Sequence, residues 1–185
     1  MALTKTPVCD FGKKAEDFKL KSIDNKLISL KDIKGEKATL IMFICNHCPY
    51  VKAIIKDLAK DCTELRKEGI NSVAIMSNDT KNYLMDSFDN MIKFAKENNF
   101  GELNYLFDET QEIAKKYNAV CTPDFYGYNK NLKLQYRGRY RELKDLKPVL
   151  NGDSDLKVAM KMISQTQKGP DQQIPSMGCN IKWFK

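Results

Sequence analysis

The most distinctive chemical feature of the sequence is a pair of cysteines, Cys45 and Cys48, separated by two residues. Seven uncharged residues, 38–44, precede the pair, and an amphipathic segment begins directly after it. Free N–H groups and the positive end of the helix dipole stabilise a thiolate at the start of a helix. The two-residue spacing also lets the second thiol reach the first and close a disulfide. The pattern therefore predicts thiol–disulfide chemistry where a buried strand ends and a helix begins.

The order of the two cysteines suggests a role for each. We expect Cys45 to lie at the mouth of the helix with a lowered pKa and to act as the nucleophile. Cys48 is then the shielded, resolving thiol that breaks the mixed disulfide formed between Cys45 and a partner. His47 is the only histidine of the chain and lies between the cysteines. When charged, it is expected to stabilise the thiolate and make the dithiol more oxidising.

Two other roles for the cysteine pair remain open from the residues alone. Both cysteines could be structural residues of the core. Alternatively, Cys45, His47, Cys48 and one further cysteine could supply four ligands to a metal ion, as in a metal-binding or redox-sensing module. A four-cysteine zinc module usually has two close pairs, whereas this sequence has one. We therefore expect no metal and no cofactor.

Apolar patterns on both sides of the pair predict alternating strands and helices. The uninterrupted run 38–44 predicts a strand buried on both faces, and we expect a second buried strand at 71–76 and a short strand at 103–107. Apolar residues at spacings of three and four predict one helix of about five turns from Pro49 to Gly69. The same periodicity predicts further helices around 88–95, 109–117 and 156–163. Alternating residues predict an N-terminal hairpin within 12–30, turning at 24–26, and a second one from strands at 125–128 and 132–136.

This order of elements predicts an α/β fold with a mainly parallel, mixed sheet covered by helices on both faces. We expect one domain over residues 1–185, with a C-terminal tail at 169–185 packed on it through Trp183 and Phe184. Thr122-Pro123 opens a strand downstream of the dithiol, and we expect its peptide bond to be cis. Strand, dithiol, helix and a later Thr-Pro together form the pattern of a thioredoxin fold. Thr122 and Pro123 are accordingly expected to bind the partner, with the backbone of Thr122 presented to a partner strand.

Motifs along nearly the whole chain carry a family resemblance. Gly12-x-x-Ala15-x-x-Phe18-x-Leu20 and Leu30-x-Asp32-x-x-Gly35 resemble the N-terminal signature of the redoxin superfamily, which covers alkyl hydroperoxide reductase/thiol-specific antioxidant proteins and their thioredoxin-like relatives. Further motifs look like the Cys-Asn-His-Cys subgroup of bacterial thioredoxin-family redoxins: Phe43-x-Cys45-Asn-His-Cys48-Pro-Tyr-Val51-Lys, Ser77-Asn78-Asp79, Asp108-Glu-Thr110-Gln-Glu, Val120-Cys121-Thr-Pro-Asp124-Phe, Tyr136-Arg-Gly138-Arg and Ser176-Met-Gly-Cys179-Asn-Ile-Lys-Trp183. The resemblance implies a thioredoxin fold with an N-terminal β extension, and dithiol–disulfide or peroxide chemistry.

The sequence departs from both well-known members of that superfamily. Peroxiredoxins carry Pro-x-x-x-Thr-x-x-Cys around the peroxide-reacting cysteine. If that cysteine is aligned with Cys48, then Cys45 stands where Thr belongs, and the run 40–44 has no Pro. Thioredoxin itself encloses Gly-Pro between its cysteines, whereas this chain has Asn46-His47. The sequence therefore favours thiol–disulfide exchange, with a peroxiredoxin-like thiol peroxidase as the alternative.

The other four cysteines stand alone in the sequence. Cys121 precedes Thr122-Pro123 and could approach the dithiol as a third redox thiol, or pack as a small core residue. Cys179, in the tail, could be an extra resolving thiol. Cys62 lies on the apolar stripe of the helix that follows the dithiol, which indicates core packing. No acidic residue stands out as a buried base, and Asp79, Glu109 and Asp124 are equal candidates.

Composition limits the classes of partner. The net charge of +7 comes from lysines scattered along the chain, which is typical of a solvated surface, so we expect no nucleic-acid partner. No stretch has the length of a membrane span. The first residues lack the apolar region of a secretory leader, so we expect a cytoplasmic protein. The expected partners are disulfide- or thiol-bearing proteins, including a thioredoxin or glutathione system, and the expected state is a monomer or weak dimer.

Overall fold

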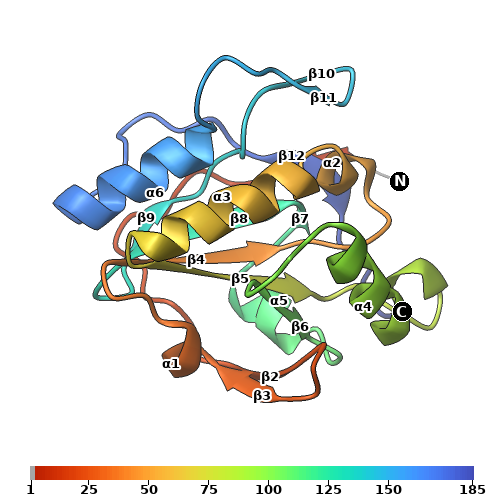
Figure 1. Cartoon of the computed structure of the whole chain (residues 1–185). Helices are drawn as coiled ribbons and strands as arrows, with labels where there is room; N and C mark the ends of the chain where they lie inside the picture. The colour runs from red at the N-terminus through yellow and green to blue at the C-terminus, as the bar shows by residue number, and fades with distance from the viewer. Residues whose placement is uncertain (1–2) are drawn as a thin grey trace.

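The computed structural model describes residues 3–185 and is built around one mixed sheet (Figure 1). The sheet has seven strands in the order β3-β2-β6-β5-β4-β8-β9. Their bounds are β2 Lys19–Ser22, β3 Leu27–Ser29, β4 Ala38–Phe43, β5 Ile70–Met76, β6 Asn104–Phe107, β8 Asp124–Asn129 and β9 Leu134–Tyr136. The three strands β4, β5 and β6 are parallel, and β8 runs antiparallel to β4. The predicted α/β class with a central mixed sheet is confirmed, with the N-terminal hairpin β2–β3 at one edge.

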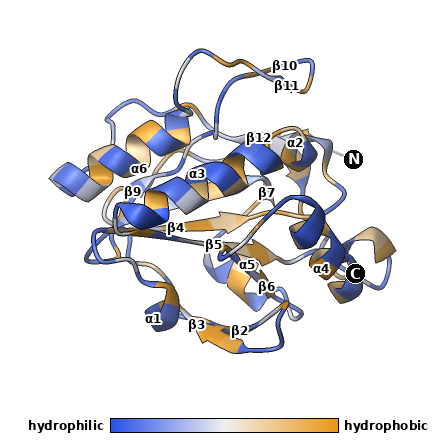
Figure 2. Cartoon of the chain, viewed as in Figure 1, coloured by the Kyte–Doolittle hydropathy of each residue, from blue (hydrophilic) through white to orange (hydrophobic). Residues whose placement is uncertain are grey.

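The strand that leads to the dithiol lies inside the sheet. All six residues of β4 are buried, between β5 on one side and β8 on the other. A strand covered by helices on both faces needs apolar side chains at every position, which explains the continuous apolar run. Figure 2 shows β4 mostly in the hydrophobic colour, whereas the helices show both colours along their length.

Helices cover both faces of the sheet. Their bounds are α1 Leu30–Ile33, α2 Pro49–Lys52, α3 Ile55–Lys67, the 3-10 helix η1 Leu84–Asp86, α4 Phe88–Glu97, α5 Glu112–Lys116 and α6 Asp155–Thr166. In Figure 1, α3 and α6 lie side by side over one face, and α1 and α5 lie on the other. Ser87 and Ser154 cap α4 and α6 by accepting backbone N–H groups, and Gly69, with φ of +82°, follows the end of α3.

The single helix predicted from Pro49 to Gly69 is in fact two helices, α2 and α3, so the prediction of one continuous helix is wrong. The backbone N–H of Ala53 still bonds to the carbonyl of Pro49, but that of Ile54 bonds to Val51, one residue nearer. The hydrogen-bond ladder is therefore interrupted between α2 and α3. The break lets α2 take its own direction at the dithiol while α3 packs along the sheet.

The C-terminal tail forms a strand that the sequence did not suggest. A second sheet has the order β1-β12-β7, with β1 Leu3–Lys5, β7 Cys121–Thr122 and β12 Met177–Asn180. A short hairpin, β10 Leu143–Lys144 and β11 Lys147–Pro148, projects from the body. Trp183 and Phe184 are 38% and 41% exposed, whereas Ile181 is 1% exposed. Strand pairing and Ile181 hold the tail, and Trp183 and Phe184 add contacts with Lys115 and Lys81 from partly exposed positions.

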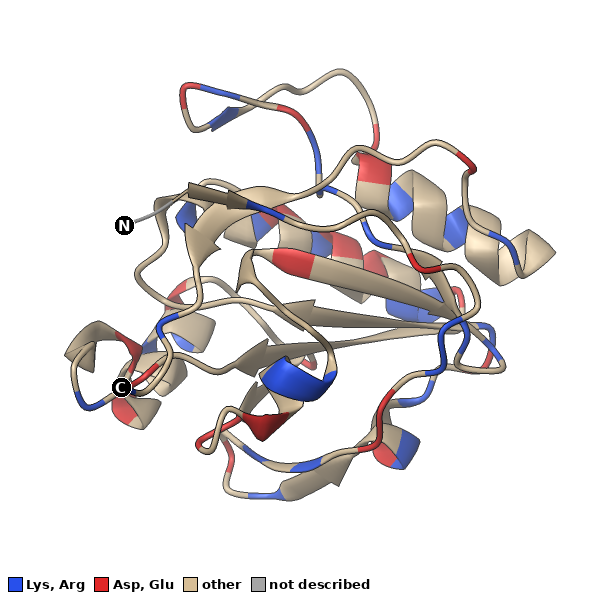
Figure 3. Cartoon of the chain, turned by 180° about the vertical axis from the view of Figure 1, so that it is seen from behind, with Lys and Arg blue, Asp and Glu red and all other residues tan. Residues whose placement is uncertain are grey.

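Most charged residues lie on the surface, and a few, among them Asp86, Asp124 and Arg137, are buried. Figure 3 shows basic and acidic residues interspersed over helices and loops, while the strands of the sheet are mostly uncharged. Within residues 3–185, no helix combines the length and the apolar character needed to cross a membrane.

Candidate active site

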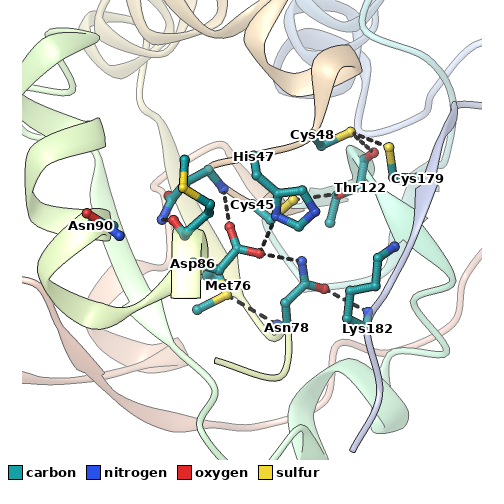
Figure 4. Close-up of polar contacts among 12 residues, drawn as sticks. Cys45, His47, Cys48, Met76, Asn78, Asp86, Asn90, Thr122, Cys179 and Lys182 are labelled. Atoms are coloured by element: carbon teal, nitrogen blue, oxygen red, sulfur yellow. Dashed lines mark hydrogen bonds and ion pairs between the residues drawn. The ribbon is translucent and has the colours of Figure 1, made fainter. Parts of the chain in front are cut away.

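The dithiol lies where β4 ends and α2 begins. The chain leaves the sheet after Phe43, and Cys48 is the N-cap residue of α2, with Pro49 at the first helical position. Cys45 and Cys48 are both 0% exposed, and all six cysteines of the chain are free thiols in this structure. The close-up in Figure 4 shows both side chains beside the segment that contains Thr122.

Thr122 contacts both sulfur atoms of the pair. Its hydroxyl lies 3.2 Å from Cys45 Sγ, and its carbonyl oxygen lies 3.1 Å from Cys48 Sγ. The Thr122–Pro123 peptide bond is cis. The structure thus brings Cys45, Cys48, Thr122 and Pro123 together, as expected of the predicted site.

The pKa of Cys48 is lowered to about 5. The largest cause is a hydrogen bond from the thiol of Cys45, opposed by burial, and the thiol of Cys179 also donates. Backbone N–H groups of Val51 and Cys179 add two further donors. Donors stabilise the thiolate more than the thiol, and the N-terminal end of a helix acts in the same direction.

The pKa of Cys45, by contrast, is raised well above its usual value. The hydrogen bond given to Cys48 is the largest cause, followed by burial and by the nearby carboxylate of Asp86. The expectation that Cys45 lies at the helix mouth with a lowered pKa is therefore wrong. The position at the helix start belongs to Cys48, and Cys45 lies deeper, against an acidic group.

Asp86 and His47 form a buried polar pair beside Cys45. His47 Nδ1 donates to Asp86 Oδ2 at 2.6 Å, and the side chains are 14% and 0% exposed. The imidazole also stacks on Tyr83, with ring centroids 5.9 Å apart. A nitrogen of His47, an oxygen of Asp86 and Cys45 Sγ all lie within 4.8 Å of one another. A histidine held through one nitrogen by a carboxylate keeps its other nitrogen for proton transfer.

Asp86 is a site residue that the sequence reasoning missed. Besides His47, it accepts hydrogen bonds from the backbone N–H of Asn46 and from the side chain of Asn78, each at 2.8 Å. Asn78 in turn accepts from the backbone N–H of Lys182 in the tail, and Figure 4 shows this chain of contacts. The only sequence signal was the resemblance of Ser77-Asn78-Asp79 to a family motif, which marks the loop and not Asp86.

The three carboxylates considered from sequence lie elsewhere. Asp79 accepts from Lys81 and Asn82 within its own loop. Glu109 is exposed. Asp124 is fully buried and pairs with Arg137, whose Nη2 lies 2.9 Å from Asp124 Oδ2. None of the three forms a hydrogen bond with Cys45 or Cys48, whose partners are Thr122 and Cys179.

Cys45, His47 and Asp86 could bind a thiophilic divalent cation only if their present hydrogen bonds were rearranged. Cys45, His47 and Asp86 offer a sulfur, a nitrogen and an oxygen, a set that suits Zn²⁺. However, the Asp86 carboxyl already accepts from His47, Asn46 and Asn78, and these donors would have to be given up. The geometry fits a hydrogen-bonded proton-transfer group better than a metal site.

The two additional cysteines proposed from sequence differ in position. Cys179 Sγ lies 3.1 Å from Cys48 Sγ, so the tail cysteine belongs to the site. Cys121 is buried, and its thiol donates to the carbonyl of Pro123 at 3.7 Å. Burial raises the pKa of Cys121 far above its usual value, which favours the role of a core residue.

The expectation for the backbone of Thr122 needs one correction. Thr122 was expected to be presented to a strand of a partner protein. In the structure, its strand β7 is already paired antiparallel with β12, and Cys179 stands opposite Thr122. The place expected for a partner strand is filled by the chain itself.

Comparison with solved structures shows close relatives over the whole chain. An uncharacterised conserved protein from Geobacillus kaustophilus is 38% identical, with a TM-score of 0.93 over 100% of this chain and 97% of that one. A hypothetical protein from Sinorhizobium meliloti is 33% identical, with a TM-score of 0.89 over 98% of each chain. No functionally curated protein matches the chain.

More distant structures show the fold. The thioredoxin domain of a thiol-disulfide oxidoreductase from Bacteroides vulgatus is 17% identical, with a TM-score of 0.58 over 69% of this chain and 86% of that one. The model of the AhpC/TSA family matches residues 11–140, which include the dithiol, Asp86 and Thr122-Pro123. The resemblance seen in the motifs is thereby confirmed. The chain therefore belongs to the AhpC/TSA family, and its general function is thioredoxin-like redox chemistry.

Proposed function

We propose that this protein is a thiol–disulfide oxidoreductase whose Cys45–Cys48 dithiol exchanges with disulfides of partner proteins or small thiols. One observation carries the proposal: both sulfur atoms contact Thr122 next to the cis bond to Pro123, and the pKa of Cys48 is lowered to about 5. A thiolate next to a second thiol is the arrangement that thiol–disulfide exchange requires.

The pKa order favours the reverse of the roles expected from sequence. The Cys48 thiolate attacks one sulfur of the partner disulfide, a Cys48–partner bond forms, and the other partner sulfur leaves as a thiolate that takes up a proton. Cys45 then loses its proton and attacks Cys48 Sγ, which releases the second partner thiolate and forms the Cys45–Cys48 disulfide. Two electrons thus pass from the dithiol to the partner.

His47 is suited to take the proton that Cys45 loses. A nitrogen of His47 lies within 4.8 Å of Cys45 Sγ, and Asp86 fixes the ring through Nδ1. Because Nδ1 is the donor to Asp86, Nε2 is the nitrogen that remains free to accept a proton. Asp86 itself acts through His47 and is a positioning residue.

A groove beside the dithiol supports a protein or peptide partner. It has a volume of about 530 Å³ and is lined by Tyr50 and Pro123, which flank the site, and by Met177 of β12. Lys5, Arg139, Arg141 and Asp145 also line it, and Arg139 is paired with Asp155, so Lys5 and Arg141 carry the positive charge of the groove. Apolar walls with basic side chains fit a segment that carries apolar and acidic residues next to its cysteine.

Reduction of insulin disulfides in the presence of dithiothreitol tests the proposal. We expect Cys45→Ser and Cys48→Ser each to abolish turnover, because neither can complete the two-step exchange. Cys9→Ser is the matched control, since Cys9 is partly exposed and outside the site, and it should react at the wild-type rate. Unchanged turnover in Cys45→Ser would contradict the proposal.

Peroxide reduction is the second candidate function. The lowered pKa of Cys48 at the start of α2 favours it, because a thiolate at a helix N-terminus is the reactive form toward peroxides. Position 45, where the family resemblance places a threonine, carries a cysteine instead. Stopped-flow oxidation by hydrogen peroxide decides between the two: fast peroxide-dependent oxidation of Cys48 supports a peroxidase, and slow oxidation with active disulfide exchange supports the oxidoreductase.

A further inference from the structure

The C-terminal strand occupies the position at which a thioredoxin-like protein would receive a partner strand. β12 pairs antiparallel with β7 so that Cys179 faces Thr122 and Asn180 faces Cys121. A partner strand would use the same backbone edge next to the cis proline. The chain therefore carries a cysteine on a strand of its own at the place where a substrate would present one.

Sulfur contacts continue from the dithiol to this strand. Cys48 Sγ lies 3.1 Å from Cys179 Sγ, and the thiol of Cys45 is the largest influence on the pKa of Cys48. Cys48 is thus the central sulfur of three. Cys179 is the one with measurable exposure, 5% against 0% for both Cys45 and Cys48. The tail cysteine is the most exposed of the three, and Figure 4 shows it next to Cys48.

Contacts on both sides hold β12 in this register. β1 pairs with its outer edge, with Leu3 opposite Cys179. Ser176 donates to the carbonyl of Pro123 at 2.7 Å, directly before the strand. A Cβ atom on Gly178 would lie 2.0 Å from the Thr122 carbonyl oxygen, so only glycine allows this approach. The position of Cys179 is a consequence of close strand packing.

We propose that β12 is an internal partner strand and that Cys179 exchanges with the dithiol at Cys48, so that the oxidised protein alternates between a Cys45–Cys48 and a Cys48–Cys179 disulfide. The inference rests on the proposed function, because exchange with a partner disulfide supplies the oxidised dithiol.

The exchange step balances without a further reactant. Cys179 loses its proton as it attacks Cys48 Sγ, the Cys48–Cys179 bond forms, and the Cys45–Cys48 bond breaks. Cys45 leaves as a thiolate and takes up the proton that Cys179 lost, so no net oxidation or reduction occurs. The disulfide thereby moves from Cys45 to Cys179, the most exposed sulfur of the three.

Peptide mapping after oxidation tests the inference. The protein is equilibrated with oxidised glutathione, free thiols are blocked with N-ethylmaleimide, and tryptic peptides are measured by mass spectrometry. Cys45 and Cys48 share the peptide 38–52, and Cys179 lies in the peptide 169–182. A Cys45–Cys48 bond makes peptide 38–52 lighter by two hydrogen atoms, whereas a Cys48–Cys179 bond links the two peptides.

The decisive variant is Cys45→Ser, which leaves only Cys48 and Cys179 at the site. We expect the linked peptides in this variant, and their loss in Cys45→Ser/Cys179→Ser. Cys45→Ala is analysed in parallel, so that a folding defect in either single variant is recognised by its disagreement with the other. If Cys48 carries glutathione and Cys179 stays alkylated in both, the internal exchange is overturned. A different result would contradict the proposed function: the wild type would never show the lighter form of peptide 38–52, whatever happens at Cys179.

Discussion

The sulfur atoms of Cys48 and Cys179 lie 3.1 Å apart, although 131 residues separate them in the sequence. The contact joins the start of α2 to the C-terminal strand β12. In the neutral form Cys48 Sγ donates to Cys179, whereas in the thiolate form the Cys179 thiol donates to Cys48 and contributes to its lowered pKa. Burial, in turn, raises the pKa of Cys179 to about 12, so this cysteine keeps its proton near neutral pH. The two residues therefore form a donor–acceptor pair within the site.

The first prediction concerns the charge on Cys48. Its pKa of about 5 depends most on the hydrogen bond from Cys45. Cys45→Ala removes the donor and should raise the pKa of Cys48, whereas Cys45→Ser keeps a hydroxyl donor and should raise it less. Iodoacetamide reacts with the thiolate, so its reaction rate at Cys48 falls as the pH drops through the pKa. We expect this fall near pH 5 in the wild type and at higher pH in Cys45→Ala. Identical pH profiles would refute the assigned cause.

The second prediction concerns Asp86. Its carboxylate contributes to the raised pKa of Cys45, so Asp86→Asn should lower that pKa. The asparagine also holds the ring of His47 less firmly, and we expect a lower rate of disulfide exchange with little change in partner affinity. The ultraviolet absorbance of the Cys45 thiolate in a Cys48→Ser background follows the titration. Asp89→Asn, at an exposed position in the nearby helix α4, is the control. A Cys45 titration that is the same in both variants would speak against the role of Asp86.

The third prediction concerns stability. Asp124 and Arg137 form an ion pair whose side chains are 0% and 7% exposed. Asp124→Asn leaves the guanidinium buried without its charged partner, and we expect a loss of about 3–5 kcal/mol in the free energy of unfolding. The exposed pair Arg66–Glu102 provides the comparison, where Glu102→Gln should cost about 0–1 kcal/mol. Urea denaturation measures both, and equal small losses would show that burial of the first pair is energetically unimportant.

The fourth prediction concerns Gly178. A methyl group there meets the carbonyl oxygen of Thr122, so Gly178→Ala should push β12 away from β7 and separate Cys179 from Cys48. A displacement cost of about 1.4 kcal/mol would reduce the share of the Cys48–Cys179 disulfide roughly tenfold. The Cys45–Cys48 disulfide should still form. Met177→Ala, which changes a partly exposed side chain on the same strand, should leave both disulfides unaffected. Equal shares of Cys48–Cys179 in the two variants would contradict the assigned role of β12.

Features that depend on local sequence were predictable. The apolar run of β4 and the Cys-x-x-Cys spacing define the dithiol, and the later Thr122-Pro123 marks the segment that packs against it. The apolar residues of each strand or helix recur at the period of that element, because each element buries one face or both faces. These signals were sufficient for the fold class and for four residues of the site: Cys45, Cys48, Thr122 and Pro123.

Features that depend on distant contacts were not predictable. Asp86 lies in a polar loop and becomes part of the site only because its carboxyl collects donors from Asn46, His47 and Asn78. β12 is a strand of four residues in a segment with glycine and proline, so it lacks an alternating pattern of its own. The order of the two pKa values depends on the hydrogen bond between Cys45 and Cys48 and, beyond it, on contacts with Cys179 and Asp86, which lie far away in the sequence.

A redox titration of the wild type with glutathione tests the central claim most directly. The protein is equilibrated over a range of ratios of reduced to oxidised glutathione, quenched with acid, alkylated and mapped. We expect Cys45 and Cys48 to form one reversible intramolecular disulfide that follows a two-electron curve, with about 30 mV per tenfold change in the ratio of oxidised to reduced protein. If both cysteines remain thiols, or carry only glutathione, at every ratio, then the dithiol is not a redox couple and the account is contradicted.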